Sequence, residues 1–288
     1  MKIHQLDIVA AYLNGFLNEE VFMEKPEILE KILLEIIQRD GKNSVSGTKA
    51  TKMLQDAQDE NKVCLLKRAL YGLRQAGRQW HARLDTVIRQ LGLIPTNADP
   101  CLYSTRRDKT QLIALIYVDD ILICSQDEVW IKEFCQGLAR EFKVKELGLA
   151  RYCLSIEINQ DEDASSLTQQ KYIREILDRF HMKSCNPVST PGETRVRATD
   201  LMEDQTSKED ENSTRPYREL IGALMYLAIA TRPDIAYITS YLAQFNHCFT
   251  QEQWGAAKRI LRYLQGTSNF GLHFRKTNDK MTGYSDAD

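Results

Sequence analysis

The sequence has no long hydrophobic run and no excess of charge of one sign. No apolar stretch in its 288 residues approaches the roughly 20 residues that a helix needs to span a bilayer. The first eight residues also lack the apolar core of a signal peptide. These absences predict a protein that is neither secreted nor inserted in a membrane. The net charge of -2 gives no basic field over the whole molecule, so any contact with nucleic acid must use charge gathered on one face.

The cysteines and histidines form no recognisable framework. The seven cysteines are scattered and odd in number, and none stands in a Cys-x-x-Cys pair. This pattern predicts reduced thiols in a cytosolic or nuclear protein. The five histidines match no zinc spacing. The share of hydrophobic residues, 43%, and of charged residues, 27%, is ordinary for a globular protein of one large or two small domains.

Hydrophobic periodicity predicts alternating helices and strands in the first part of the chain. The predicted helices cover 27–38, 75–91, 128–141 and 170–180, and the predicted strands cover 3–8, 63–66 and 152–159. Residues 41–62 are polar, rich in Ser, Thr, Gly, Lys and Asp. We therefore expect an exposed insertion or a disordered loop there.

The second part of the chain follows a different pattern. Residues 186–215 carry prolines, many charges and few apolar side chains, which predicts an extended linker and places the domain boundary there. Helices are then predicted over 217–230, 233–245 and 251–265, followed by strands over 270–274 and 281–285. The basic residues Lys258, Arg259 and Arg262 would lie on the last of these helices, where they either contact phosphates or keep the helix solvated.

The most unusual local feature is a pair of acids between two apolar runs. Residues 112–117 and 121–124 are strongly apolar, and Asp119 and Asp120 stand between them, which predicts a buried β-hairpin with acids at its tip. Neighbouring carboxylates repel unless a cation lies beside them, and carboxylate oxygens suit Mg²⁺. If Asp7, at the end of another apolar strand, converges on Asp119, two ions about 4 Å apart could transfer nucleotidyl or phosphoryl groups. The alternative is that the pair only supplies turn chemistry.

Three motifs set this hairpin in a longer pattern. Asp-Ile-Val-Ala-Ala-Tyr-Leu-Asn-Gly at 7–15, Leu-Tyr-Gly-Leu-Arg-Gln-Ala-Gly-Arg-Gln-Trp at 70–80 and Tyr-Val-Asp-Asp at 117–120 occur in this order. Together they resemble the reverse transcriptase of copia-type LTR retrotransposons. The resemblance continues through 142–148, 187–191, 231–235 and 258–267 and covers nearly the whole chain. Residues 283–288 look like the opening strand of the ribonuclease H domain that follows the polymerase in that family.

The resemblance implies an α+β fold. It predicts a reverse-transcriptase palm, an antiparallel sheet with helices packed on one face, over 1–185, with partial fingers that include the 41–62 insertion. The extended linker 186–215, a mainly helical thumb or connection over 216–267 and a truncated start of ribonuclease H over 268–288 would follow. A fingers segment expected ahead of Asp7 is missing from this sequence.

The resemblance also assigns roles to the acids. Asp7 and Asp119 match the family's metal-binding pair, and Asp120 matches the third catalytic carboxylate, which implies two Mg²⁺ ions with Mn²⁺ as a substitute. Asp286 matches the first carboxylate of ribonuclease H, whose partner acids would lie on later strands. We therefore expect that second activity to be missing.

Four more residues match positions that contact substrate in the family. Tyr12 aligns with the bulky residue beneath the incoming sugar, where an aromatic ring excludes a 2′-hydroxyl. Gln75 matches the glutamine near the incoming nucleotide and template, while Arg74 and Arg78 either reach phosphates or lie on a solvated helix face. Gly77 departs from the family, which usually has proline there.

The predicted activity is that of an RNA-directed DNA polymerase. Its partners would be an RNA or DNA template with primer, dNTPs and the rest of a polyprotein with protease, integrase and ribonuclease H, with no membrane. The resemblance places it in cytoplasmic virus-like particles or in the nucleus. Two alternatives remain: a catalytically dead remnant that at most binds nucleic acid, and a captured interaction module.

Overall fold

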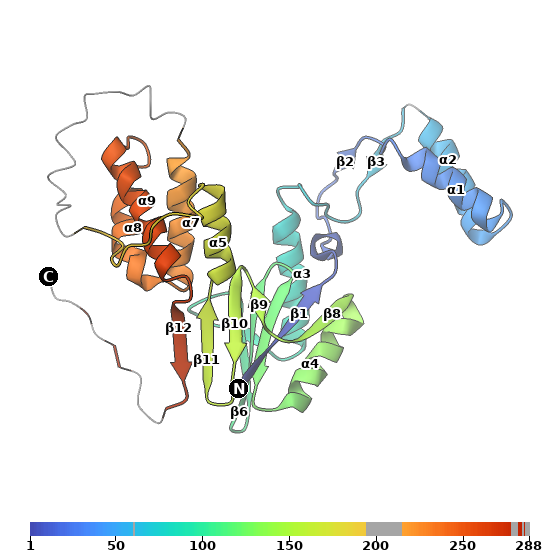
Figure 1. Cartoon of the computed structure of the whole chain (residues 1–288). Coiled ribbons are helices and arrows are strands. Elements are labelled where there is room, and N and C mark those ends of the chain that lie inside the picture. Colours follow the sequence, from blue (N-terminus) through green and yellow to red (C-terminus); the bar gives the residue numbers. More distant parts are fainter. Residues whose placement is uncertain (60, 194–214, 278–281, 284, 286–288) are drawn as a thin grey trace. The chain divides into compact units, whose positions relative to one another are not determined.

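The chain forms two compact units, Met1–Leu149 and Ala150–Asp288 (Figure 1). The computed structural model describes all residues except 60, 194–214, 278–281, 284 and 286–288. The division between the two units, after Leu149, lies ahead of the domain boundary expected at 186–215. The reason is long-range pairing, since the strands and helix of 150–185 associate with later elements of the chain. The functional domain names remain predictions.

A six-stranded antiparallel sheet is the centre of the first unit. Its strand order is β4-β5-β6-β7-β1-β8, so the first strand of the chain lies between two later ones. The strands are β1 Lys2–Ile8, β4 Ile94–Pro95, β5 Leu102–Arg107, β6 Thr110–Tyr117, β7 Asp120–Ser125 and β8 Val144–Leu149. The predicted hairpin of 112–124 is confirmed as β6 and β7, which pair from Leu112 and Ser125 to Tyr117 and Asp120.

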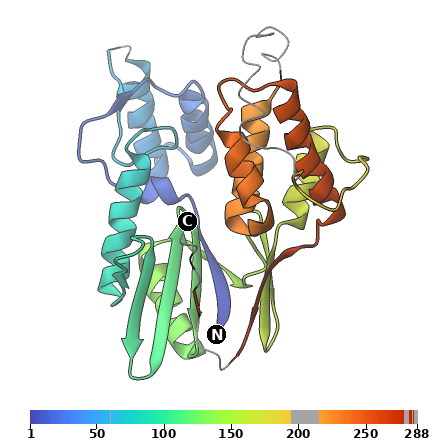
Figure 2. The same ribbon diagram turned by 90° about the vertical axis from the view of Figure 1, so that its left-hand side faces the viewer.

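Two helices cover one face of this sheet (Figure 2). They are α3 Ala76–Gln90 and α4 Glu128–Glu141, close to the predicted spans. Alternation along the strands turns Leu6, Ile8 and Ile121 toward Trp80 of α3 and Phe134 of α4. Burial of each such side chain contributes about 1.5–3 kcal/mol, so this layer holds the central strands in register.

The polar stretch 41–62 is not a disordered loop, which corrects that part of the expectation from its composition. It contains α2 Val45–Gln58, which packs against α1 Leu29–Asp40. Ser44 caps α2 by accepting a hydrogen bond from the amide of Gly47. A Cβ at Gly47 would lie 2.0 Å from the carbonyl oxygen of Gly41, so only glycine allows this close packing. Small residues form the buried face of α2, and hydrophobic periodicity does not register them.

Short elements join this helical hairpin to the sheet. They are the 3-10 helix η1 Ala11–Asn14 and the paired strands β2 Phe22–Met23 and β3 Cys64–Leu65. Figure 1 shows the β2–β3 ribbon leading from the body of the first unit to α1 and α2.

The second unit combines a four-stranded antiparallel sheet with helices. The sheet order is β12-β11-β10-β9, from β9 Tyr152–Cys153, β10 Ile156–Gln160, β11 Ala164–Thr168 and β12 Gly271–Arg275. The strand predicted over 152–159 is thus two strands, because a tight turn at Leu154 and Ser155 reverses the chain. The helices gather at one end of this sheet (Figure 1).

Those helices share one apolar core. They are α5 Gln170–Arg179, α7 Tyr217–Ala230, η2 Pro233–Ile235, α8 Ala236–Ala243 and α9 Gln251–Gly266. The span of α7 is the predicted one, whereas the helix predicted over 233–245 begins as the 3-10 turn η2. The predicted strand over 281–285 and Asp286 fall on positions that lie wholly or partly outside the described residues. No described helix is long and apolar enough to cross a membrane.

Candidate active site

The three predicted acids lie at the same end of the two central strands. Asp7 of β1 is paired directly with Asp120 of β7, and the amide of Ile8 donates to the backbone oxygen of Asp119 at 2.9 Å. Directly opposed residues point to the same face of a sheet. Since Leu6, Ile8 and Ile121 turn toward the helices, the side chains of Asp7 and Asp120 lie on the face that α3 and α4 leave uncovered.

A strained two-residue turn carries Asp119. Tyr117 pairs with Asp120, so only Val118 and Asp119 connect β6 to β7. Val118 has φ +56°, which is rare and costly for a β-branched residue. The indole Nε1 of Trp80 donates to the carbonyl oxygen of Val118 at 2.7 Å. Trp80 therefore helps to hold the turn, in addition to its packing in the core.

Two side chains lie beside the acids on the same sheet. Gln5, two residues before Asp7, donates from its amide Nε2 to Oδ1 of Asp120 at 2.9 Å. On the other side of β1, Lys145 of β8 is the partner of Asp7 in the register. The two carboxylates thus have a neutral donor and a basic residue as neighbours on their strands.

Tyr12 stands on η1, directly after the strand of Asp7. Its ring lies 4.8 Å from the ring of Tyr71, centroid to centroid, at a 45° tilt. Close packing of η1 on α3 depends on Gly15, because a Cβ there would lie 3.0 Å from the backbone nitrogen of Trp80. Ala10, with φ +54°, makes the left-handed turn between β1 and η1. These backbone features place Tyr12 on the short helix that directly follows the strand of Asp7.

The other predicted substrate residues lie at the start of α3. Gln75 precedes the helix and donates to Oε1 of Glu19 at 2.9 Å. Arg74 and Arg78 are exposed, and neither makes an ion pair or hydrogen bond with any residue the structure describes. Their guanidinium groups are free to bind an anion.

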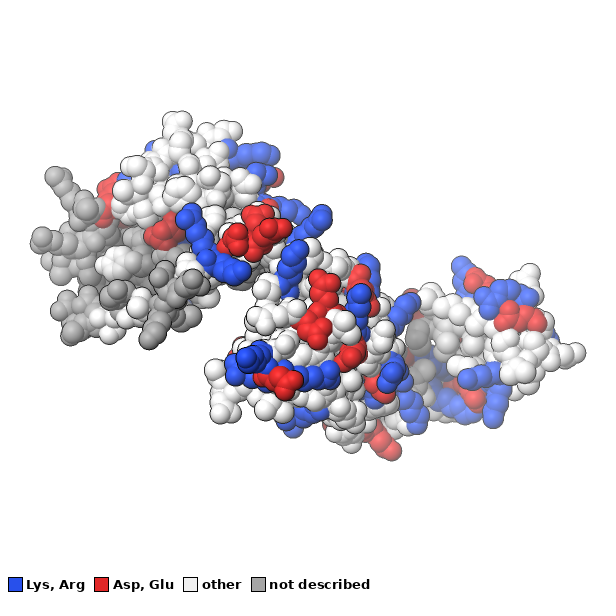
Figure 3. Space-filling view, turned by 90° about the horizontal axis from the view of Figure 1, so that it is seen from below, with Lys and Arg blue, Asp and Glu red and all other residues white. Residues whose placement is uncertain are grey.

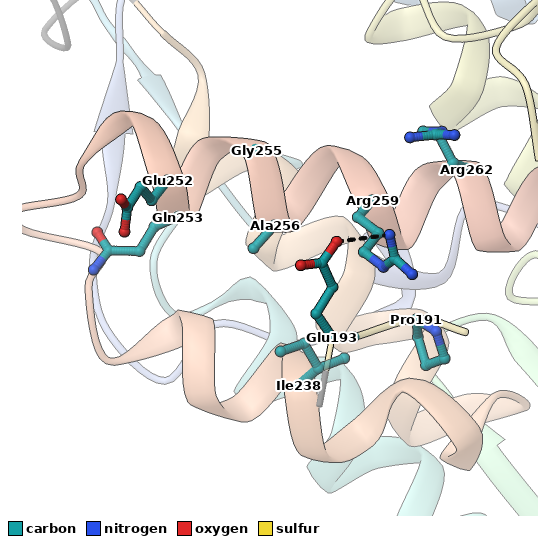
Figure 4. A pocket seen from close by; sticks show the side chains of 10 residues that line it. Pro191, Glu193, Ile238, Glu252, Gln253, Gly255, Ala256, Arg259 and Arg262 are labelled. Carbon is teal, nitrogen blue, oxygen red and sulfur yellow. Dashed lines mark hydrogen bonds and ion pairs between the residues drawn. The ribbon is translucent and has the colours of Figure 1, made fainter. Parts of the chain in front are cut away.

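The basic residues of α9, unlike Arg74 and Arg78, contact other described residues. Arg259 forms an ion pair with Glu193 at 2.9 Å and donates to the hydroxyl of Thr190. Arg262 donates to the backbone oxygen of Asn186 at 2.7 Å, and Lys258 lies 5.8 Å from the ring centroid of Trp254. Arg259 and Arg262 also line a cavity of about 380 Å³ in the second unit (Figure 4). The predicted acids do not line this cavity.

The surface charge does not form one broad field on the face that Figure 3 shows. Lysine and arginine side chains there are interspersed with acids, in keeping with the net charge of -2.

The donor chemistry of the three aspartates suits a hard divalent cation, which takes carboxylate oxygens and completes its shell with water and substrate phosphates. Among the described residues, however, no three His, Cys, Asp or Glu side chains are already arranged to hold a metal ion.

Periodicity alone missed two residues of the site. The roles of Gln5 and Trp80 depend on hydrogen bonds to β7 and to the β6–β7 turn, which are distant in sequence. The sequence feature that could have identified Gln5 is its position two residues before Asp7, because residues two apart lie on the same face of a strand. For Trp80 the sequence offered only its place at the end of the motif at 70–80.

Comparison with known proteins identifies the family. Residues 48–194, about half of the chain, match the family model described as reverse transcriptase (RNA-dependent DNA polymerase). The chain belongs to the reverse transcriptase family. The matched range contains Asp119, Asp120 and the residues at the start of α3, whereas Asp7 and Tyr12 precede it.

Individual relatives extend the likeness to the whole chain. It is 36% identical over all of its length to the retrovirus-related Pol polyprotein from transposon TNT 1-94 of Nicotiana tabacum, and covers 20% of that protein. It is 34% and 35% identical over 99% of its length to the Pol polyproteins from transposons RE2 and RE1 of Arabidopsis thaliana, covering 18% of each. The resemblance to copia-type elements is thus confirmed. The chain spans about a fifth of the length of these polyproteins.

Proposed function

We propose that the chain is the DNA-synthesising segment of a copia-type Pol polyprotein, an RNA-directed DNA polymerase that also copies DNA. One observation carries this proposal: the register that pairs Asp7 with Asp120 and places Asp119 in the adjoining turn. It puts three acids at the end of two buried strands, in a chain of the reverse transcriptase family. In the reaction, the 3′-hydroxyl of a primer attacks the α-phosphate of a dNTP and pyrophosphate leaves.

In this proposal the unit Met1–Leu149 serves as the palm and the helices of the second unit as the thumb or connection. Asp7 and Asp119 would hold Mg²⁺ or Mn²⁺, and Asp120 would support them. Bound as a pair, the two ions would activate the attacking hydroxyl and stabilise charge on the leaving pyrophosphate. The strained turn that Trp80 holds presents Asp119 in one conformation, which limits reorganisation during the reaction.

The residues around the acids would bind the substrates. The ring of Tyr12 would exclude a ribonucleotide by occupying the space of its 2′-hydroxyl. Arg74 and Arg78 are exposed and have no protein partner in the described part, so they would contact phosphates. Gln75 donates to Glu19 in this structure. It would give up this hydrogen bond to contact the nucleotide or the template. Template and primer, dNTPs and the remaining polyprotein domains are the proposed partners, in cytoplasmic particles or the nucleus.

The test is incorporation of labelled dNTP on primed RNA and DNA templates with Mg²⁺. We expect incorporation by the chain and its loss in Asp119→Asn. Asp108→Asn is the matched control, because Asp108 is an aspartate in another hairpin turn of the same sheet, between β5 and β6. It should retain full activity.

Other outcomes distinguish the alternatives. Incorporation that survives in Asp119→Asn would contradict the assignment of the site. Salt-dependent binding of primer and template without incorporation would identify a catalytically dead remnant. Absence of nucleic-acid binding would favour a captured interaction module.

A further inference from the structure

Gln5 is a buried polar residue in the middle of β1, with 7% of its surface exposed. A buried amide is costly unless it is hydrogen-bonded. Its Nε2 donates to Oδ1 of Asp120 at 2.9 Å, across 115 positions of sequence. The contact therefore exists only because β1 and β7 are neighbours in the sheet.

The register explains how this contact forms. Asp120 is directly opposite Asp7, while Gln5 is directly opposite Leu122. Gln5 thus reaches Asp120 along the diagonal, a distance that long side chains can bridge. On its other side Gln5 faces Gly148 of β8, which places no side chain beside it.

The hydrogen bond from Gln5 to Asp120 counteracts the repulsion between the carboxylates of Asp7 and Asp120. Asp7 and Asp120 are like charges in directly opposed positions, an arrangement that destabilises a strand pair. The amide of Gln5 draws one oxygen of Asp120 toward the interior of the strands and fixes the rotamer of that carboxylate. The carboxylate of Asp7 stays available at the strand end.

The residue type matters as much as the position. A glutamine amide donates without carrying charge, so it orients Asp120 and leaves the negative charge of the acids intact for a cation. Lysine at this position would neutralise that charge, glutamate would add a third repelling carboxylate, and asparagine would be one methylene too short for the diagonal.

We propose that Gln5 is a positioning residue, which sets the orientation of the Asp120 carboxylate for a divalent cation shared by the acids. The inference rests on the proposed function, since it takes the acids to be the cation site. It assigns Gln5 no contact with substrate: its effect on any reaction passes through Asp120.

The test compares Gln5→Met, which keeps the size but removes the donor, with Gln5→Glu and with Gln160→Met. Gln160 is the matched control, because its Nε2 also makes a 2.9 Å hydrogen bond, to the backbone oxygen of Ala150 in the second unit. Two measurements are made on the full chain: Mn²⁺ binding by calorimetry without substrate, and the Mg²⁺ concentration that gives half-maximal dNTP incorporation.

Gln5→Met should weaken Mn²⁺ binding and raise the required Mg²⁺ concentration about tenfold, the scale for residues that orient metal ligands. Gln5→Glu should do the same, and Gln160→Met should change neither quantity. In an Asp120→Asn background, Gln5→Met should add less than about a twofold effect, because the residue through which it acts is already altered. Circular dichroism should show equal folding for all variants.

The outcomes separate this inference from the proposed function. Unchanged Mn²⁺ binding in Gln5→Met, or an equal loss with and without Asp120→Asn, would overturn the role of Gln5 even if the chain is an active polymerase. If the wild-type chain binds Mn²⁺ in a Gln5-dependent way but incorporates no dNTP, the positioning role stands and the proposed function fails. No Mn²⁺ binding by the wild-type chain would overturn both.

Discussion

Each unit contains a two-residue hairpin turn with the same unusual construction. Val118 leads the turn between β6 and β7 with φ +56°, and Leu154 leads the turn between β9 and β10 with φ +50°. In both turns an aromatic side chain from a helix donates to the carbonyl oxygen of the leading residue, Trp80 in the first unit and Tyr226 in the second. Both turns thus begin with a residue at positive φ whose carbonyl oxygen accepts a hydrogen bond from a helix side chain.

The two turns differ in the residue that follows. Asp119 follows Val118 beside two further carboxylates, whereas Ser155, with φ +60°, follows Leu154. Positive φ is therefore common to both turns, whereas neighbouring carboxylates occur at only one of them. The accumulation of like charge next to one strained turn is what distinguishes it.

The two units also differ in how their charged side chains are paired. Arg232 in the second unit is 1% exposed, and its guanidinium donates to both carboxylate oxygens of Asp234 and to two oxygens of Thr267. Tyr263 also donates to Asp234. Buried charge there is fully paired, as stability requires, while the acids of the first unit oppose each other.

The largest expected effect is on activity. Asp119→Asn should lower dNTP incorporation on the order of 10⁴-fold, the scale for losing an essential catalytic carboxylate. Its unfolding midpoint should be unchanged or higher, because one repelling charge is removed. Ser155→Asn, the same residue type in the other turn, should keep full incorporation. A large loss in Ser155→Asn would contradict the contrast between the turns, and primer extension with thermal unfolding measures both.

The next effect is on stability. Arg232→Met should destabilise the protein by about 3 kcal/mol, because it leaves Asp234 and the oxygens of Thr267 without their donor. Urea unfolding followed by the fluorescence of Trp254, on α9 of the same unit, measures it. A change below about 1 kcal/mol would mean that the network is solvated like a surface ion pair.

Asp234 makes this contribution depend on pH. Burial raises the pKa of Asp234, but hydrogen bonds from Arg232 and Tyr263 outweigh burial and hold the pKa below its ordinary value. The carboxylate therefore adds stability above the unfolded-state pKa of about 4, and this stability is lost as pH falls through the folded-state pKa. Asp234→Asn should be less stable than wild type at pH 7 by roughly 1 kcal/mol, allowing for partial exposure of Asp234. Unfolding curves of the two proteins should converge below about pH 4.

The smallest effects concern the turns themselves. Glycine adopts positive φ without the steric cost of a side chain, which is about 1–2 kcal/mol, but it loses about 0.5–1 kcal/mol more in conformational entropy on folding. Ser155→Gly should therefore raise stability by about 0.5–1 kcal/mol. Val118→Gly should relieve similar strain but lower incorporation, because the more flexible turn no longer presents Asp119 in one conformation. Unchanged incorporation in Val118→Gly would show that turn rigidity has no part in the proposed reaction.

Prediction from sequence succeeded where a local pattern coincides with a packing face. The helices α4 and α7 and the hairpin of β6 and β7 have strong apolar periods, and each appears at the predicted place. Prediction failed for α2, whose buried face consists of Gly47, Ala50 and Ala57. It also missed the turn at Leu154 and Ser155, since neither residue type favours left-handed φ.

The sequence by itself determined the family of this protein and the three acids it offers, because motif order and residue type are local properties. Tertiary structure alone decided which side chains meet. The pairing of Asp7 with Asp120, the contact of Gln5 with Asp120 and the hydrogen bond from Trp80 to Val118 join residues 38 to 115 positions apart. Such contacts depend on strand order and register, which a chain acquires only when its apolar faces are buried together.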